Sequence, residues 1–183
     1  MKLIKHLFTM FILFNFNATT ADERSDQLNR LFDELKIDNT VLTHETEQKI
    51  WGIWSTHPTN QQLTNRLTEG STFVRNKKLS KAVKIYTEVI NKDPKWAEAW
   101  NKRATVLYMM GDYKGSQDDI DKVLEIEKRH FGALAGQGLV NIKLGNYEKA
   151  IESYEKAKKI YPSMQSPKIM IKQIKELIKQ ELI

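Results

Sequence analysis

The chain has 183 residues, of which 40% are hydrophobic and 28% are charged, and these values fit a globular domain and exclude a wholly disordered chain. The formal net charge is +6, but the lysines are spread along the chain without stacking aromatic residues between them, which argues against a nucleic-acid partner. Because the chain has no cysteine, disulfides, thiol catalysis and thiolate metal sites are excluded.

The beginning of the chain has the pattern of a secretory signal peptide. Lys2 and Lys5 form a short basic start, the apolar run 7–16 follows, and small residues come after it. The run is far shorter than the roughly 20 residues that cross a bilayer, and its flanks suit export. We predict a signal peptide over the first 21 residues, cleaved after Ala21 or after Ala18, and export to the bacterial periplasm. The alternative is an uncleaved anchor.

Residues 22–60 predict an N-terminal hairpin of two helices. The second of these helices is expected from about Thr43 to Ser55, because His57-Pro58 disfavours further helix. Trp51 and Trp54 lie near its end and either form an exposed docking surface or are buried. We expect them to be buried between this hairpin and the first of the repeats that follow, so that the hairpin caps the repeats. The first helix has one apolar face, made of Leu28, Leu31, Phe32 and Leu35.

Residues 61–164 repeat with a period of 34 residues, in three units at about 63–96, 97–130 and 131–164. A fixed period of this length indicates stacked helical hairpins. The small residues that recur permit paired helices to approach closely, and the large ones fill the space between them. The positions that stay in phase are Gly70, Ala104 and Gly138; Ala82, Ser116 and Ala150; and Tyr86, Ile120 and Tyr154.

The second and third units carry a specific turn pattern and resemble the tetratricopeptide repeat (TPR). Gly111 and Gly145 end the first helix of each hairpin, and Asp112 or Asn146 starts the next. In the first unit Arg66 replaces the tryptophan of the motif and Lys77-Lys78 replace the Gly-Asp turn, so this unit is degenerate. The other motif residues are Trp100, Arg103, Leu107, Tyr113 and Val123 in the second unit, and Leu134, Gln137, Asn141, Tyr147, Ala157 and Pro162 in the third.

The resemblance covers roughly 100 of the 183 residues. It implies an all-α, TPR-type solenoid of stacked antiparallel helical hairpins, here with an N-terminal helical preface and a C-terminal capping helix. The stretches around Trp100 and Phe131 also resemble small exported bacterial TPR proteins of unassigned role.

Residues 165–183 predict one amphipathic helix that caps the end of the solenoid. Ser166 and Pro167 favour a helix start. The alternative is a basic helix lying on an anionic membrane, but every solenoid end needs a polar-backed cap, and we expect no membrane contact after signal cleavage. The expected apolar face is Met170, Ile174, Leu177, Ile178 and Leu182, with Lys168, Lys172, Lys175 and Lys179 on another face.

No catalytic, cofactor or metal site is predicted. The histidines are scattered, and the acidic run 118–125 has the periodicity of a solvated helix and no glycine turn for a metal loop. No phosphate-binding loop, nucleophile elbow or zinc-binding helix motif is present. We therefore predict a non-enzymatic protein.

The TPR resemblance implies a concave groove lined by the first helix of each hairpin, which suits a peptide segment or a partner helix. Leu67, Ser71, Gly132 and Gly136 stand where TPR domains that clamp chaperone carboxylates carry Lys, Asn and Arg, so we do not expect such a clamp. The predicted function is a protein-interaction module or adaptor. The alternative is a structural or oligomerising subunit of an envelope assembly that uses Trp51 and Trp54 and the C-terminal helix. The predicted partner-binding residues, some of which are expected to do no more than pack, are Leu67, Ser71, Arg75, Asn101, Thr105, Tyr108, Met109, Leu139, Ile142 and Lys143.

Overall fold

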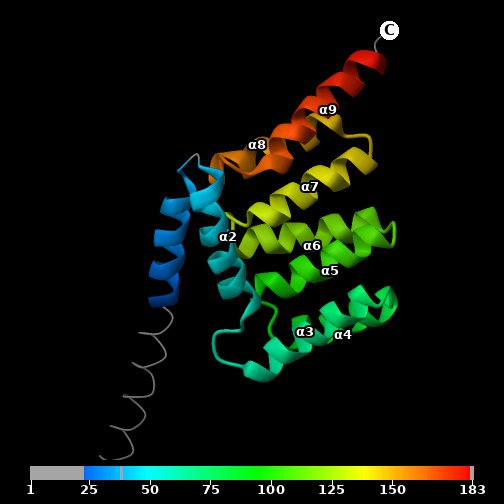
Figure 1. The fold of residues 1–183 in the computed structure, drawn as a ribbon. Coiled ribbons are helices and arrows are strands. Elements are labelled where there is room, and N and C mark those ends of the chain that lie inside the picture. The colour runs from blue at the N-terminus through cyan, green and yellow to red at the C-terminus, as the bar shows by residue number, and fades with distance from the viewer. Residues whose placement is uncertain (1–22, 38, 182–183) are drawn as a thin grey trace, which may run out of the picture.

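A computed structural model describes residues 23–37 and 39–181, and within these residues every regular element is a helix. The stack is built from three pairs, α3 (Gln61–Arg75) with α4 (Leu79–Lys92), α5 (Ala97–Met109) with α6 (Tyr113–Ile126), and α7 (Phe131–Lys143) with α8 (Tyr147–Ile160). α9 (Gln165–Glu181) packs against α8, while α2 (Thr40–Ser55) stands beside the stack, next to the helix of residues 23–35 (Figure 1). The predicted all-α solenoid of helical hairpins is confirmed.

The turn inside each hairpin has the same geometry in all three pairs. Gly111 and Gly145 have φ angles of +83° and +73°, the left-handed region that glycine adopts without steric cost. Lys77 occupies the equivalent position of the first pair and has a φ of +56° although it is not glycine. In each turn the next residue's N–H donates to a carbonyl five residues back, for example Asp112 to Leu107 at 3.0 Å. The degenerate first unit therefore keeps the turn without its usual residues.

Pairing within each hairpin depends on a small residue that faces a large one. A Cβ atom added to Gly70 would lie 2.4 Å from the Tyr86 ring, and one added to Gly138 would lie 2.5 Å from the Tyr154 ring. Such distances leave no room for a methyl group. The first and third hairpins therefore close through a Gly–Tyr contact.

Arg66 lies at the free end of the stack, and this position explains why it replaces tryptophan. The equivalent Trp100 packs between the first and second hairpins, where it contacts two of the hydrophobic clusters. No described helix precedes the first hairpin in the stack, so an indole at position 66 would face solvent. Arg66 instead forms ion pairs with Glu69 and Glu88. A polar end of this kind keeps a solenoid soluble.

The N-terminal hairpin, formed by residues 23–35 and α2, does not cap the first repeat as we predicted. It lies along one side of the stack, where the loops between successive repeats come together (Figure 1). The burial of Trp54 is confirmed, because its side chain is 6% exposed, but its place is different: the ring stacks on His130 with centroids 4.0 Å apart. His130 is the residue just before α7, the first helix of the third repeat. The apolar face of the first helix of the N-terminal hairpin reaches the Trp54 cluster through Phe32 and Leu35.

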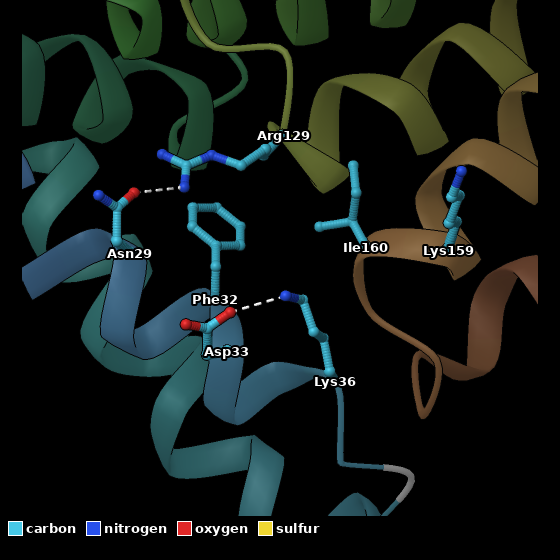
Figure 2. A pocket seen from close by; sticks show the side chains of 7 residues that line it. All are labelled: Asn29, Phe32, Asp33, Lys36, Arg129, Lys159 and Ile160. Carbon is cyan, nitrogen blue, oxygen red and sulfur yellow. Dashed lines mark hydrogen bonds and ion pairs between the residues drawn. The ribbon is translucent and has the colours of Figure 1, made fainter. Parts of the chain in front are cut away.

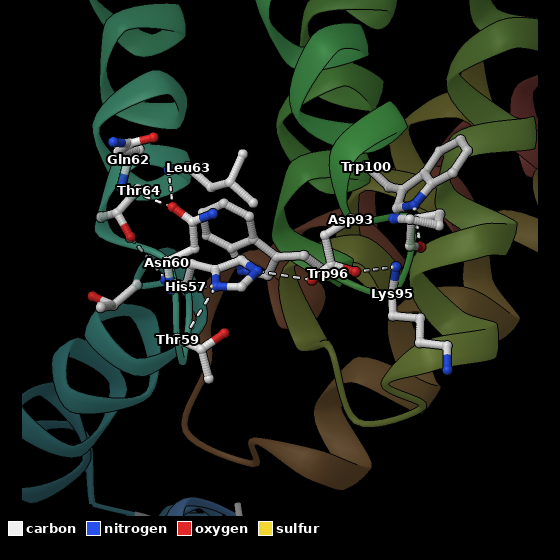
Figure 3. Close-up of polar contacts among 12 residues, drawn as sticks. His57, Thr59, Asn60, Gln62, Leu63, Thr64, Asp93, Lys95, Trp96 and Trp100 are labelled. Atoms are coloured by element: carbon white, nitrogen blue, oxygen red, sulfur yellow. Dashed lines mark hydrogen bonds and ion pairs between the residues drawn. The ribbon is translucent and has the colours of Figure 1, made fainter. Parts of the chain in front are cut away.

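The two loops between repeats and the loop that leads into α9 are all tied to this hairpin. The first loop contributes Asp93, whose Oδ2 lies 2.8 Å from Nε2 of His57, two residues after the end of α2 (Figure 3). It also contributes Trp96, whose indole N–H donates to the Trp54 carbonyl at 2.8 Å. The second loop stacks its histidine on the Trp54 ring. In the last loop the hydroxyl groups of Thr43 and Ser163 are 2.6 Å apart. The hairpin thus fastens the repeats to one another along one edge.

α9 covers the last repeat with one apolar face. Ile171 and Ile174 are buried in a cluster with Ala150 and Tyr154, and Met170 and Ile178 pack against it. Leu177, which we expected on this face, is 41% exposed, and Leu182 and the predicted signal peptide lie outside the described residues. Among the helices that the structure describes, none has both the length and the apolar character needed to cross a bilayer.

Candidate protein-binding groove

The first helices of the three pairs, α3, α5 and α7, form the groove face to which our sequence-based prediction assigns partner binding. The predicted residues fall into three groups by exposure. Leu67 and Asn101 are 3% and 9% exposed, so they support the fold and are not free to contact a partner. Ser71, Tyr108 and Ile142 are half-buried. The exposed ones are Arg75, Thr105, Met109, Leu139 and Lys143.

One small cavity, which we call the α5–α7 pocket, opens between α5 and α7 above α6. Its volume is about 70 Å³. Asn101, Thr105, Tyr108 and Leu139 of the predicted set line it, whereas the predicted residues of α3 do not. The remaining lining residues are Ala104, Ser116, Ile120, Gly132, Ala133 and Gly136. The structure therefore brings four predicted residues of α5 and α7 together around one cavity, and the predicted residues of α3, in the first repeat, lie outside it.

Three of the four polar side chains that line this pocket donate hydrogen bonds within the protein, and Tyr108 is the fourth. The Asn101 amide donates to Glu98 Oε2 at 2.9 Å, and the Thr105 hydroxyl donates to the Asn101 carbonyl at 3.0 Å. The Ser116 hydroxyl donates to the Ala104 carbonyl at 2.9 Å. Since these donors are satisfied, the pocket offers a mainly apolar surface.

Beside the pocket lies a buried hydrogen-bonded pair that the sequence did not predict. Glu98 and His130 are fully buried, and His130 Nε2 lies 3.2 Å from Glu98 Oε2. His130 Nδ1 accepts the Ala133 backbone N–H at 3.1 Å, so Nε2 carries the proton that is donated to Glu98. Burial opposes ionisation of Glu98, but the His130 hydrogen bond and the Lys102 ammonium, 3.1 Å away, together hold its pKa below the ordinary value.

The N-terminal hairpin closes the groove face at this end. A Cβ atom on Gly132 would lie 2.6 Å from the Trp51 ring, and Lys102 Nζ lies 6.0 Å from the centre of the same ring. The sequence showed that Gly132 replaces a polar residue of the chaperone-binding type, but it did not show that an indole covers the position. The open part of the groove face therefore extends from the α5–α7 pocket toward Met109 and Lys143.

A larger hollow of about 450 Å³ lies between the N-terminal hairpin and the loops it contacts (Figure 2). Two of its four charged residues pair with each other. Arg129 donates to Asn29 at 2.8 Å and covers the Phe32 ring at 4.2 Å, and Lys36 pairs with Asp33 at 2.7 Å. We interpret it as a solvated seam of the hairpin's own interface. In the described part of the chain, no group of three or more His, Asp or Glu side chains is placed to hold a metal ion.

Comparisons with known proteins agree with this geometry. A family model described as Tetratricopeptide repeat matches residues 132–164, which is the third hairpin. A TPR repeat-containing protein of Rhizobium etli is 39% identical over 90 residues, or 49% of this chain and 44% of that protein. Hsp70-Hsp90 organizing protein 1 of Glycine max is 29% identical over 97 residues, or 53% of this chain and 17% of that protein. This chain thus spans less than half the length of either relative.

Solved structures show the same fold. The first TPR of Spaghetti (RPAP3), bound to the HSP90 peptide SRMEEVD, has a TM-score of 0.63 at 17% identity, covering 65% of this chain and 94% of that one. The family resemblance that we drew from the turn and packing residues is confirmed. The repeated hairpins, the family model that matches the third of them and this structural likeness show that the chain contains a tetratricopeptide repeat and has a TPR-type fold.

Proposed function

We propose that this protein is a non-enzymatic interaction module that binds a peptide segment or a partner helix of another protein on the open part of its groove face. The observation that carries the proposal is the α5–α7 pocket, where predicted residues of two successive repeats meet around one cavity. The RPAP3 domain, which has this fold, was solved with a bound peptide. This likeness supports the same mode of binding here.

The charge of the groove face favours an acidic partner. Arg75 and Lys143 are exposed at its two ends. Glu98, the one acidic residue of α5, is buried beside Lys102 and His130, and α7 contains no Asp or Glu. The one acidic residue of α3, Glu69, pairs with Arg66. Complementary charge of this kind speeds encounter and rejects basic partners more than it adds affinity. We therefore propose a partner segment that carries Asp or Glu beside apolar residues.

The blocked end of the groove argues against capture of a terminal carboxylate. Trp51 covers Gly132, and Leu67 is buried in the first hairpin. Both positions would need exposed polar side chains in a carboxylate clamp. We propose that recognition depends on side chains within the segment, so amidating the peptide's C-terminus should leave its affinity unchanged.

The test uses peptides selected from a random dodecapeptide library and measures their affinity by calorimetry. Leu139→Glu places a charge at the mouth of the α5–α7 pocket and should abolish binding. Leu144→Glu, the matched control, makes the same change at a leucine of similar exposure (47% against 39%) that does not line the pocket. Equal loss in both variants, or retained binding in Leu139→Glu, would place the binding surface elsewhere.

The alternative of a structural or oligomerising subunit has lost one of its supports. Trp54 is buried, and Trp51 is half-buried against the third repeat, so the two do not form an exposed patch. Light scattering over a range of concentrations tests what is left of this alternative, since self-association would raise the measured mass.

We propose export on the pattern of the first 21 residues alone. After cell fractionation, the intact mass of the soluble periplasmic protein should correspond to a chain that starts at Asp22 or Thr19. A membrane-bound chain that keeps Met1 would support the uncleaved anchor instead.

A further inference from the structure

The α5–α7 pocket exists because the second repeat breaks the packing rule of its neighbours. In the first and third hairpins a glycine faces a tyrosine ring, as Gly70 faces Tyr86 and Gly138 faces Tyr154. At the equivalent positions of the second hairpin stand Ala104 and Ile120. The methyl group of alanine would clash with a tyrosine ring there, so the two replacements belong together.

The exchange of a phenol ring for a shorter side chain leaves unfilled space. Ala104 and Ile120 both line the pocket. The wall on the α7 side is open as well, because a Cβ atom on Gly136 would meet only Ile120 Cδ1, at 3.7 Å. In the first hairpin the corresponding ring fills this region, and its hydroxyl lies 3.1 Å from Ser71 Oγ. The pocket is therefore a specific feature of the second repeat.

The size and lining of the pocket define what would fill it. Its volume of about 70 Å³ corresponds to roughly two water molecules, which is enough for the branched end of an aliphatic side chain and too little for an indole. Three of the four polar side chains around it, Asn101, Thr105 and Ser116, donate hydrogen bonds within the protein, and Tyr108 is the fourth. A polar side chain placed there would lose its water for little gain in partners.

We infer that the α5–α7 pocket is a specificity pocket that accepts one branched aliphatic side chain, Val, Leu or Ile, from an acidic partner segment. This inference rests on the proposed function of the groove face. The acidic character follows from the exposed cation Lys143 and from the absence of Asp and Glu in α7. The position is continuous with an interface that the protein already makes, since Gly132 both lines the pocket and receives the Trp51 ring.

The experiment compares a filled pocket with a matched control. Gly136→Leu places an isobutyl group in the cavity, whereas Gly52→Leu makes the same change on α2, where a Cβ atom meets nothing within 4 Å. A second pocket-filling variant, Ala104→Gly with Ile120→Tyr, rebuilds the Gly–Tyr contact of the neighbouring repeats. Circular dichroism and thermal melting establish that each variant is folded before binding is measured.

Peptides are selected from the random dodecapeptide library on the unchanged protein and then synthesised. We expect one position to be Val, Leu or Ile in all of them, and its replacement by Ala should weaken binding roughly 10- to 100-fold, as expected for burial of two or three carbon groups. The unreplaced peptide should bind Gly136→Leu, or the rebuilt Gly–Tyr variant, with an affinity lowered by the same factor. On these variants the Ala-replaced peptide should bind no more weakly than the unreplaced one. Gly52→Leu should bind like the unchanged protein.

The outcomes separate this inference from the proposed function. If no peptide is enriched, or if Leu139→Glu leaves binding intact, the proposal that the groove face binds the partner is wrong. If peptides bind in the groove without an aliphatic position, or bind equally well to a folded Gly136→Leu variant, the groove stands and the specificity pocket is overturned. An enriched aromatic or acidic residue at the position that the filled variants affect would also overturn it.

Discussion

At the scale of single residues, the third hairpin holds a buried tyrosine hydroxyl that lacks the partner its counterpart has. Tyr86 contacts the Ser71 hydroxyl, but Leu139 stands at the equivalent place beside Tyr154, whose hydroxyl is buried without a hydrogen-bond partner. Burial, with the nearby Tyr108, raises the pKa of Tyr154 to about 12. We expect Leu139→Ser to lower this pKa, because a serine hydroxyl can stabilise the phenolate. Ultraviolet titration of tyrosinate, with Tyr154→Phe to assign the signal, measures the change, and an unmoved pKa would show that no hydrogen bond forms.

The Glu98–His130 pair predicts how stability depends on pH. Because the folded-state pKa of Glu98 is below its unfolded value, its contribution to the free energy of unfolding is complete above the unfolded pKa and is lost as the pH falls through the folded one. Urea unfolding at a series of acidic pH values should show this loss. Glu98→Gln should remove this part of the pH dependence and cost roughly 1–3 kcal/mol at neutral pH, since His130 loses its ionised partner. An unchanged pH profile in Glu98→Gln would contradict the assignment.

The sequence does not show that Glu98 and His130 are in contact. Glu98 and His130 are 32 residues apart, at the beginning of two successive repeats, and only the stacking of those repeats brings them together. The period predicted which helices pair, because small and large residues recur in phase. It did not predict the contacts of residues outside the period, such as Trp51 and Trp54.

At the scale of elements, the turn between α3 and α4 carries a backbone strain that the other hairpins avoid. Lys77 has a positive φ where Gly111 and Gly145 stand in the later repeats. We expect Lys77→Gly to raise the free energy of unfolding by about 1 kcal/mol, because a side chain in the left-handed region costs roughly 1–2 kcal/mol and glycine's greater freedom in the unfolded chain offsets part of the gain. Lys78→Gly, at the neighbouring residue with a φ of −90°, should be neutral or destabilising. Urea unfolding measures both, and a loss of stability in Lys77→Gly would refute the argument.

The ends of the solenoid show how far element-level prediction reaches. The amphipathic pattern of residues 165–183 was sufficient to predict a helix, although Ile171 rather than Leu177 completes its buried face. The first repeat looked degenerate because Arg66 breaks the motif. The structure gives a physical reason, since a residue at the free end of a stack has no neighbouring repeat to pack against.

At the scale of the whole molecule, the N-terminal hairpin is a separate layer that holds the edge of the solenoid. Gly132→Ala tests this attachment, because its new methyl group would lie 2.6 Å from the Trp51 ring. We expect faster hydrogen exchange in α2 and a red shift of tryptophan fluorescence, while α5 to α8 stay protected. Gly52→Ala adds the same methyl group to open space and should change neither signal. Uniform loss of protection across all helices would show that the hairpin and the repeats unfold as one unit.

The attachment of α2 to both loops between repeats and to the loop before α9 also limits how this protein can change in length. α2 has 16 residues and is therefore about 24 Å long, which matches a small number of helix layers spaced 8–10 Å apart. One more 34-residue hairpin inserted in the stack would carry the Ser163 loop beyond the reach of Thr43, or move the stacked histidine away from Trp54. A helix that contacts all three loops therefore constrains the number of repeats that can stack beside it.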